Sequence, residues 1–200
     1  MGSLYLQVGD SAAAVSALES AKSISDDDSV IWFTLGSAYF SEAKYLQAAS
    51  ALEKGLSLEP ENAGAHFDLG NAYYKLNRYQ KAIEQYEAAV GVNEAFWPAV
   101  NNIGLVLYEM GQLEPAIEQW ERSLTLSSEE PEPTLAIAVA NYAANNNRTA
   151  AIESATAALE RDSRYADLAF LEENLWGNRL LNATEAMFDT PGLQEVLAGL

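Results

Sequence analysis

An internal repeat of 34 residues is the feature that most constrains how this chain can fold. Segments 29–62 and 63–96 align without a gap, and small residues return at the same interval along most of the sequence. One such column holds Gly2, Gly36, Gly70, Gly104 and Ala138. A column of large apolar residues holds Met1, Leu35, Leu69, Ile103 and Ile137. A repeat of this length predicts a solenoid, in which each unit packs only on its neighbours.

Within each repeat the apolar residues follow helical spacing. Trp32, Leu35, Gly36 and Tyr39 follow the spacing i, i+3, i+4, i+7, and a second group with helical spacing begins at Ala48. Each repeat is therefore expected to form two helices packed on each other. The turn between them is predicted at a column rich in residues that tolerate a left-handed backbone, namely Gly9, Ala43, Asn77, Gly111 and Asn145.

These residues resemble the tetratricopeptide repeat. The pattern Trp32-x2-Leu35-Gly36-x2-Tyr39, followed by Ala48 and Pro60, matches the family's signature and period. The fold expected is all-α, a right-handed superhelical solenoid of antiparallel helix pairs with about five repeats plus C-terminal capping helices. The residues expected to pack the repeats together are Trp32, Leu35, Gly36, Tyr39, Ala48, Leu69, Gly70, Tyr73, Ala82, Gly104 and Ala116.

The expected division places a repeat array at 1–164 and capping helices at 165–200. The array comprises a truncated first repeat at 1–28, repeats at 29–62, 63–96 and 97–130, and a degraded repeat at 131–164. In the last repeat, Ala138, Asn141 and Ser154 stand where the resemblance implies a glycine, a tyrosine and a large apolar residue. Looser packing is therefore expected there. The run 171–177 looks similar to endings of cyanobacterial repeat proteins.

Composition and charge exclude several classes of function. The chain carries a formal charge of -18, which argues against binding to nucleic acid or to anionic membrane surfaces. It has no cysteine and no apolar run long enough to span a bilayer, so direct membrane insertion is not expected. We expect a cytoplasmic protein, or one held at the periphery of a membrane complex through protein contacts.

The resemblance implies that the first helix of each repeat lines a concave groove that binds another protein. The residues expected to line that groove are Phe33, Phe40, Phe67, Asn71, Tyr74, Asn101, Asn102, Tyr108 and Tyr142. Their aromatic rings offer large, rigid contact areas at low entropic cost. The alternative interpretation is that these rings pack against neighbouring helices, and both can be true.

Some family members hold the C-terminal carboxylate of a partner with two asparagines and three basic residues. Asn71 and Asn102 match the two amides here, but Phe67, Glu132 and Ala136 stand where the basic residues would be. An acidic Glu132 would repel a free carboxylate. The resemblance and its departures together predict an internal or basic peptide segment as ligand.

An enzyme is not expected, and neither is a cofactor or a metal. The single histidine, His66, shares a column with Trp32 and Val100, which favours packing over catalysis.

The leading hypothesis is an adaptor, scaffold or assembly factor. The alternative is a self-assembling scaffold, such as a homodimer, formed through the first repeat or the C-terminal helices. The sequence leaves open whether those helices cap the array or occupy the groove.

Overall fold

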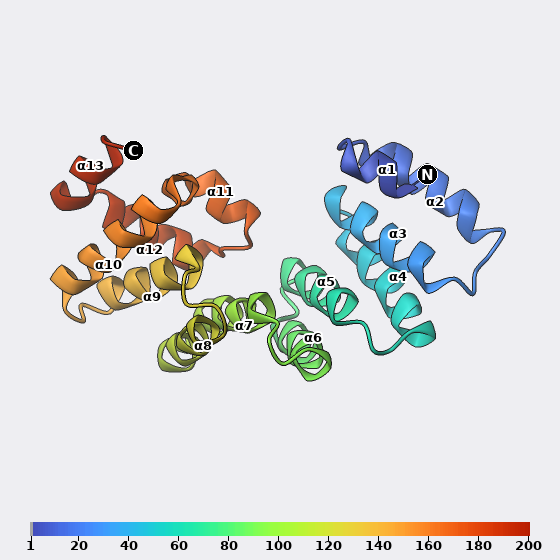
Figure 1. Ribbon diagram of the computed structural model, residues 1–200, viewed down its shortest axis with the longest axis horizontal. Coiled ribbons are helices and arrows are strands. Elements are labelled where there is room, and N and C mark those ends of the chain that lie inside the picture. Colours follow the sequence, from blue (N-terminus) through green and yellow to red (C-terminus); the bar gives the residue numbers. More distant parts are fainter. Residues whose placement is uncertain (1) are drawn as a thin grey trace. The chain divides into compact units, whose positions relative to one another are not determined.

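A computed structural model describes residues 2–200, and these residues form helices without any β-strand. The all-α class predicted from the sequence is confirmed. The α-helices are α1 (Gly2–Gln7), α2 (Ser11–Lys22), α3 (Ser29–Ser41), α4 (Tyr45–Leu58), α5 (Ala63–Lys75), α6 (Tyr79–Val92), α7 (Trp97–Glu109), α8 (Leu113–Leu126), α9 (Pro131–Ala143), α10 (Arg148–Arg161), α11 (Leu168–Glu173), α12 (Asn178–Phe188) and α13 (Pro191–Leu197) (Figure 1). A short 3-10 helix, η1 (Ser163–Ala166), precedes α11.

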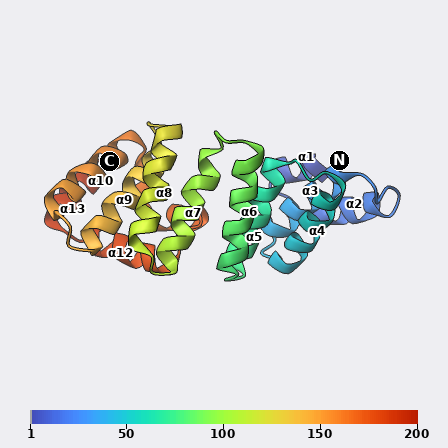
Figure 2. The same ribbon diagram turned by 90° about the horizontal axis from the view of Figure 1, so that it is seen from below.

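Consecutive helices pair into hairpins, with odd-numbered first helices and even-numbered second helices from α1 to α10. Figure 2 shows α3 beside α4, and α7 beside α8. Each turn has positive φ at the predicted column: Gly9 (78°), Ala43 (54°), Asn77 (56°), Gly111 (81°) and Asn145 (61°), and the last turn has a second such residue, Asn147 (44°). The left-handed residue of the column lets the next amide satisfy a carbonyl at the helix end, as the Lys44 amide does by donating to the Tyr39 carbonyl at 2.9 Å. The predicted turns are therefore present.

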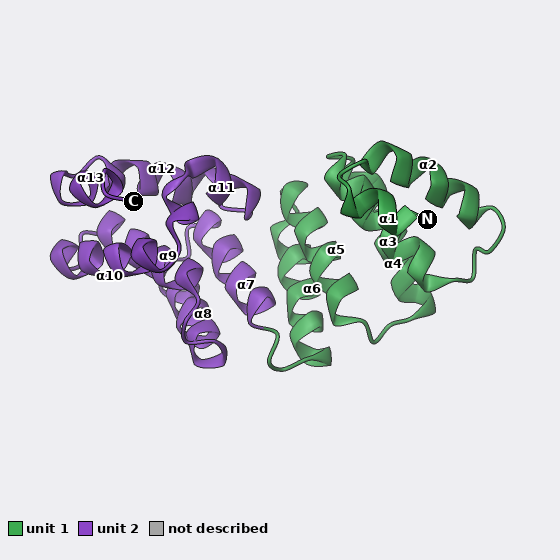
Figure 3. Cartoon of the chain, turned by 45° about the horizontal axis from the view of Figure 1, so that its top comes forward, with its two compact units in different colours: residues 1–96 green, residues 97–200 purple. Residues whose placement is uncertain are grey.

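The chain divides into two compact units, which are coloured separately in Figure 3. Unit 1 runs to Phe96 and holds α1 to α6, and unit 2 runs from Trp97 to Leu200 and holds α7 to α13. The expected division at residue 164 stays a prediction. Met1, which begins one of the predicted apolar columns, lies outside the described residues.

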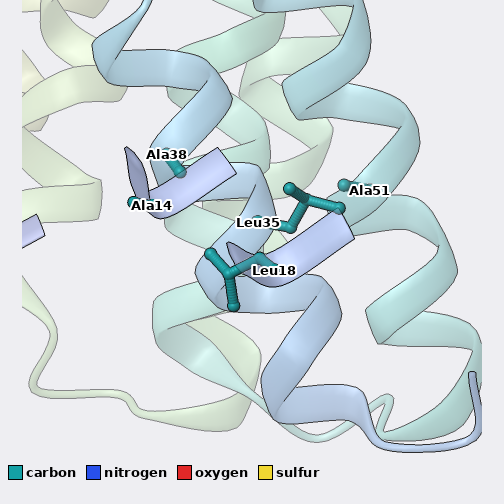
Figure 4. Packing of buried hydrophobic residues seen from close by; sticks show 5 residues of the cluster. All are labelled: Ala14, Leu18, Leu35, Ala38 and Ala51. Atoms are coloured by element: carbon teal, nitrogen blue, oxygen red, sulfur yellow. The ribbon is translucent and has the colours of Figure 1, made fainter. Parts of the chain in front are cut away.

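Glycines bring the two helices of a hairpin close together. A Cβ atom added to Gly70 on α5 would lie 2.5 Å from the Tyr86 ring on α6, and one added to Gly104 on α7 would lie 2.4 Å from the Trp120 indole nitrogen on α8. In unit 1 the hairpins are joined by small and branched apolar side chains. Figure 4 shows this packing for Ala14, Leu18, Leu35, Ala38 and Ala51, which are all buried.

The residues expected to pack the repeats lie mainly in the interior. Trp32 and Tyr39 are half-buried, and the other nine are buried. Tyr39 and Tyr73 each donate a hydroxyl hydrogen bond to a glutamate on the preceding second helix, Glu19 and Glu53. The tyrosine column therefore joins successive repeats as well as filling the hairpin.

The C-terminal helices fold back on unit 2. The expected C-terminal helices begin with η1 and the short α11, after which Leu175 takes a positive φ of 68°. Two further helices follow, α12 and α13. Helix α12 packs against α7 and α9, and α13 packs against α10. Because α7 and α9 are first helices, α12 lies on the side where the resemblance implied a groove.

Candidate peptide-binding surface

First helices α3 and α5 carry most of the predicted binding residues in unit 1. We call the side that they form the unit 1 face, defined by Phe33, Ser37, Phe40, Phe67, Asp68, Asn71 and Tyr74. All of these side chains are half-buried except Tyr74, which is 6% exposed. The face therefore presents partial surfaces of rings and polar groups at fixed positions.

Phe33 and Phe67 occupy equivalent positions and contact the second helices of their own hairpins. A Cβ atom at Gly55 on α4 would lie 2.5 Å from the Phe33 ring, so the absence of that atom makes room for the ring. The Phe67 ring centroid lies 5.8 Å from that of Tyr86 and 5.4 Å from that of Phe96. These two phenylalanines thus contribute to the packing of unit 1 as well as to its face.

Phe40 and Tyr74 stand one helical turn from the hairpin ends. The Phe40 ring centroid lies 5.3 Å from that of Tyr45, and the Tyr74 centroid lies 5.7 Å from that of Tyr79. Tyr45 and Tyr79 are the first residues of α4 and α6, so each ring pair closes its hairpin. Phe40 keeps the larger exposed fraction and offers a partner more contact area than Tyr74 does.

Polar groups link the helices in the middle of this face. Between α3 and α5, the Ser37 hydroxyl donates to an Asp68 carboxylate oxygen at 3.1 Å. Between α6 and α5, the Tyr86 hydroxyl donates to the Asn71 side-chain oxygen at 2.8 Å. Burial raises the pKa of Asp68, and the hydrogen bond from Ser37 opposes that shift in part. None of the ion pairs within residues 2–200 includes Asp68.

Asp68 and Ser37 were not predicted from the sequence. Asp68 directly follows Phe67 and precedes Asn71 by three residues, so helical spacing placed it beside predicted binding residues. A carboxylate on the same helix as the predicted aromatic and amide residues was the signal that could have identified it.

The equivalent side of unit 2 is covered by α12. Its inward side chains, Leu180, Thr184, Met187 and Phe188, are all buried. At its N-terminus, the backbone amides of Arg179 and Leu180 donate to the Glu109 carboxylate at 3.1 and 3.0 Å. The Arg179 guanidinium lies 5.4 Å from the centroid of the Tyr108 ring. The chain itself therefore fills the groove side of α7 and α9.

The predicted binding residues of unit 2 lie mostly in its interior. Asn101 and Asn102 are 1% and 7% exposed, and Tyr108 is 5% exposed and contacts Trp120. The Asn101 amide nitrogen donates to the Asn102 side-chain oxygen at 3.4 Å. Tyr142 is half-buried, and the Arg148 guanidinium lies 4.6 Å from its ring centroid. Burial leaves Asn101, Asn102 and Tyr108 little surface for a partner.

Comparison with known proteins identifies the repeats. Residues 33–100 match the sequence profile of the tetratricopeptide repeat, across most of unit 1 and the start of unit 2. This part of the chain carries tetratricopeptide repeats. No curated protein matches the chain in sequence.

Solved structures share the tetratricopeptide-repeat fold. A crystal structure of MamA is 24% identical and has a TM-score of 0.73, and the match covers 83% of this chain and 96% of MamA. MamA from Desulfovibrio magneticus RS-1 is 24% identical with a TM-score of 0.72, over 81% of this chain and 91% of that one. The first such domain of Spaghetti (RPAP3), bound to the HSP90 peptide SRMEEVD, is 24% identical with a TM-score of 0.56, over 59% and 94%. At these identities the similarity shows the fold alone.

The chain lacks a cationic site for a free carboxylate at the predicted positions. Phe67 packs on other rings, and Ala136 is fully buried. Glu132 is buried, and its carboxylate accepts hydrogen bonds from the Trp176 indole nitrogen at 3.0 Å and from the Asn101 side chain. Burial raises the pKa of Glu132 to about 7. Glu132 thus secures the segment before α12 and does not face a ligand.

The remaining polar residues have structural partners. The two ring nitrogens of His66 lie 2.8 Å from the Gln85 side-chain oxygen and 3.0 Å from the Pro60 carbonyl. Gln85 lies on α6 and Pro60 lies before α5, so the His66 side chain connects these two segments. These contacts favour a structural role for His66. In the part of the chain that the structure describes, no three acidic or histidine side chains cluster as metal ligands, and no helix is long and apolar enough to cross a membrane.

Proposed function

We propose that this chain is a protein-interaction module whose unit 1 face binds an internal, basic segment of a partner protein. The observation that carries the proposal is the Asp68 carboxylate, which lies between α3 and α5 among aromatic and amide side chains. The corresponding side of unit 2 is filled by α12, so unit 1 offers the first-helix surface for a partner. Adaptor, scaffold and assembly roles all follow from binding of this kind.

The charge of Asp68 favours a cationic ligand. A partly buried carboxylate loses hydration, and the neutral Ser37 hydroxyl offsets only part of that loss. A lysine or arginine from a partner would supply the missing opposite charge. The rings of Phe33 and Phe40 on α3 suit the same groups, because cations are attracted to aromatic faces. The formal charge of -18 on the whole chain further favours a basic partner.

The basic residues that hold a partner's C-terminal carboxylate in some family members are absent here, and their absence indicates where the bound segment lies within its partner. Spaghetti (RPAP3), in the structure described above, holds a peptide of HSP90 on this fold. That precedent supports peptide binding in general. Here Phe67, Glu132 and Ala136 replace the cations expected around a terminal carboxylate, so we propose that this chain binds a segment without a free C-terminus.

Selection from a random peptide library tests the proposal. Peptides of about 16 residues would be displayed with their C-termini fused to a phage coat protein, and selected against the full chain. Enriched peptides are expected to carry lysine or arginine together with apolar residues. Enrichment of acidic peptides, or no enrichment above an unrelated helical protein, would contradict the proposal.

Two carboxylate variants then locate the surface. Asp68→Asn should weaken binding of a selected peptide about tenfold, because a charge-assisted contact is lost while shape is kept. Glu84→Gln is the matched control, since Glu84 is exposed on second helix α6. Fluorescence anisotropy with a labelled peptide gives both dissociation constants. Equal affinities for Asp68→Asn and the wild type would exclude the unit 1 face as the cation site.

Self-assembly remains the alternative candidate, although the position of α12 supports it less than it supports peptide binding by unit 1. Helix α12 packs on the first helices of its own chain, so exchange between protomers would require it to leave that site. Light scattering at high micromolar concentration separates the two proposals. A dimer that dissociates after removal of residues 178–200 would support the alternative. The compartment, whether cytoplasmic or beside a membrane complex, stays a prediction.

A further inference from the structure

Helices α9 and α10 enclose an open pocket of about 420 Å³ on unit 2. Ile137, Ala138 and Ala151 give it an apolar floor, while Asn141, Asn147 and Ser154 supply polar groups at its wall. The pocket lies within the degraded repeat, where looser packing was expected. Its residues belong to a single hairpin and are separate from the unit 1 face.

The pocket takes the place of side chains that fill an earlier repeat. Two repeats upstream, 68 residues away, the equivalents of Asn141, Asn147 and Ser154 are Tyr73, Tyr79 and Tyr86. Both Tyr73 and Tyr86 are buried there: the Tyr73 hydroxyl reaches Glu53 on α4, and the Tyr86 ring packs on Gly70 of α5. Three aromatic residues of one hairpin are thus replaced by short polar residues in the other. Because the two backbones follow the same helical pairing, the missing rings leave a space suited to an aromatic side chain.

The repeat also indicates where the hydroxyl of such a ring would bind. The Tyr39 hydroxyl donates to the Glu19 carboxylate at 2.6 Å, and Tyr73 makes the same contact with Glu53. Burial and the neighbouring carboxylate raise the pKa of both tyrosines to about 12, so each phenol stays protonated and donates. Glu121 holds the corresponding position on α8, directly before the hairpin that lacks its tyrosine.

We propose that the pocket between α9 and α10 binds a tyrosine side chain of a partner protein. The ring fills the space left at Asn141 and Ser154, beside Ile137, Ala138 and Ala151. Its hydroxyl donates to Glu121, as Tyr39 does to Glu19. The Asn147 side-chain oxygen accepts from the Ala150 amide, which leaves its nitrogen and the Asn141 amide to hydrogen-bond the backbone that flanks the tyrosine. This site extends the proposed function to a second contact, on unit 2, and does not depend on the unit 1 face.

The side-chain analogue p-cresol is a direct probe of this pocket. Titration of the full chain, followed through the methyl resonances of Ile137 in a two-dimensional NMR spectrum, should give a saturable shift. Toluene has the same ring without the hydroxyl and should bind about tenfold more weakly, since the hydrogen bond to a charged acceptor is lost. Glu121→Gln should reduce the difference between the two probes.

A variant that restores the missing ring gives the second measurement. Asn141→Tyr places the chain's own phenol at the position of Tyr39 and Tyr73, so it should raise the melting temperature and abolish the p-cresol shift. Asn182→Tyr is the matched control, because Asn182 is exposed on α12 and should change neither quantity.

Two results would overturn the inference. One is a p-cresol titration that leaves the Ile137 methyl groups unshifted. The other is an undiminished shift in a folded Asn141→Tyr variant, with folding checked by circular dichroism. Ser154→Leu, which fills the pocket from the opposite helix, provides the same comparison if Asn141→Tyr does not fold.

Discussion

At the scale of single residues, the glycine column sets how closely the two helices of each hairpin approach. We expect Gly104→Ala to lower the free energy of unfolding by about 1–3 kcal/mol, because its new Cβ would meet the enclosed Trp120 indole at 2.4 Å. Gly91→Ala, near the end of α6, has no neighbouring heavy atom within 4 Å and should raise stability by up to about 1 kcal/mol. Urea denaturation measures both. Equal effects of the two substitutions would contradict the close approach.

Glu132 makes stability depend on pH in a direction opposite to that of most carboxylates. Burial, opposed by hydrogen bonds from Trp176 and Asn101, raises its pKa from 4.5 to about 7. The folded state then binds a proton more tightly than the unfolded state between these values. The stabilisation that the bound proton gives the folded state is therefore fully present below about pH 4.5 and is lost as pH rises through about 7. The free energy of unfolding falls by up to roughly 3 kcal/mol over this range.

Glu132→Gln tests this assignment, because an amide keeps an acceptor for Trp176 and cannot ionise. Its free energy of unfolding, measured in urea between pH 5 and pH 8, should fall less with rising pH than that of the wild type. Other carboxylates, such as Glu19, have lowered pKa values and contribute equally to both proteins. Parallel pH curves for the two proteins would show that Glu132 is ionised throughout.

At the scale of elements, α12 is the helix whose position most affects function. Its first backbone amides donate hydrogen bonds to the Glu109 carboxylate at the end of α7. The negative charge of that carboxylate also compensates the positive end of the α12 dipole. Glu109→Ala should cost about 1 kcal/mol and speed amide hydrogen exchange in α12. Glu118→Ala, at an exposed position on α8, serves as the control. Unchanged exchange in α12 would mean that side-chain packing alone holds the helix.

Helix pairing and turns could be predicted because the information is local. The turn column from Gly9 to Asn145 and the small residues at Gly36, Gly70 and Gly104 repeat within 34 positions, and the structure uses them as expected. The sequence also predicted C-terminal helices after residue 164, and the structure has α12 and α13 there.

The docking of α12 could not be predicted, because its partners are distant in sequence. Glu109 lies 70 residues before Arg179, and Glu132 lies 44 residues before Trp176. An amphipathic pattern predicts that one side of a helix is buried, without indicating against what. For the same reason Asn101, Asn102 and Tyr108 were interpreted as groove residues, although the structure buries them beneath other side chains.

At the scale of the whole molecule, the division into two units separates the proposed binding functions. The proposed cation site at Asp68 lies in unit 1, and the proposed tyrosine pocket and helix α12 lie in unit 2. We expect a fragment of residues 1–96 to remain helical by circular dichroism and to bind a selected basic peptide within about twofold of the full chain's affinity. A folded fragment that has lost this affinity would place essential contacts in unit 2.

We propose that partners bind on the first helices of unit 1 while α12 occupies those of unit 2. Hydrogen-exchange mass spectrometry of the full chain, with and without a saturating selected peptide, distinguishes the two surfaces. We expect slower exchange in α3 and α5, with α7, α9 and α12 unchanged. Protection of α7 and α9 together with faster exchange in α12 would contradict it, because the peptide would then have displaced the chain's own helix.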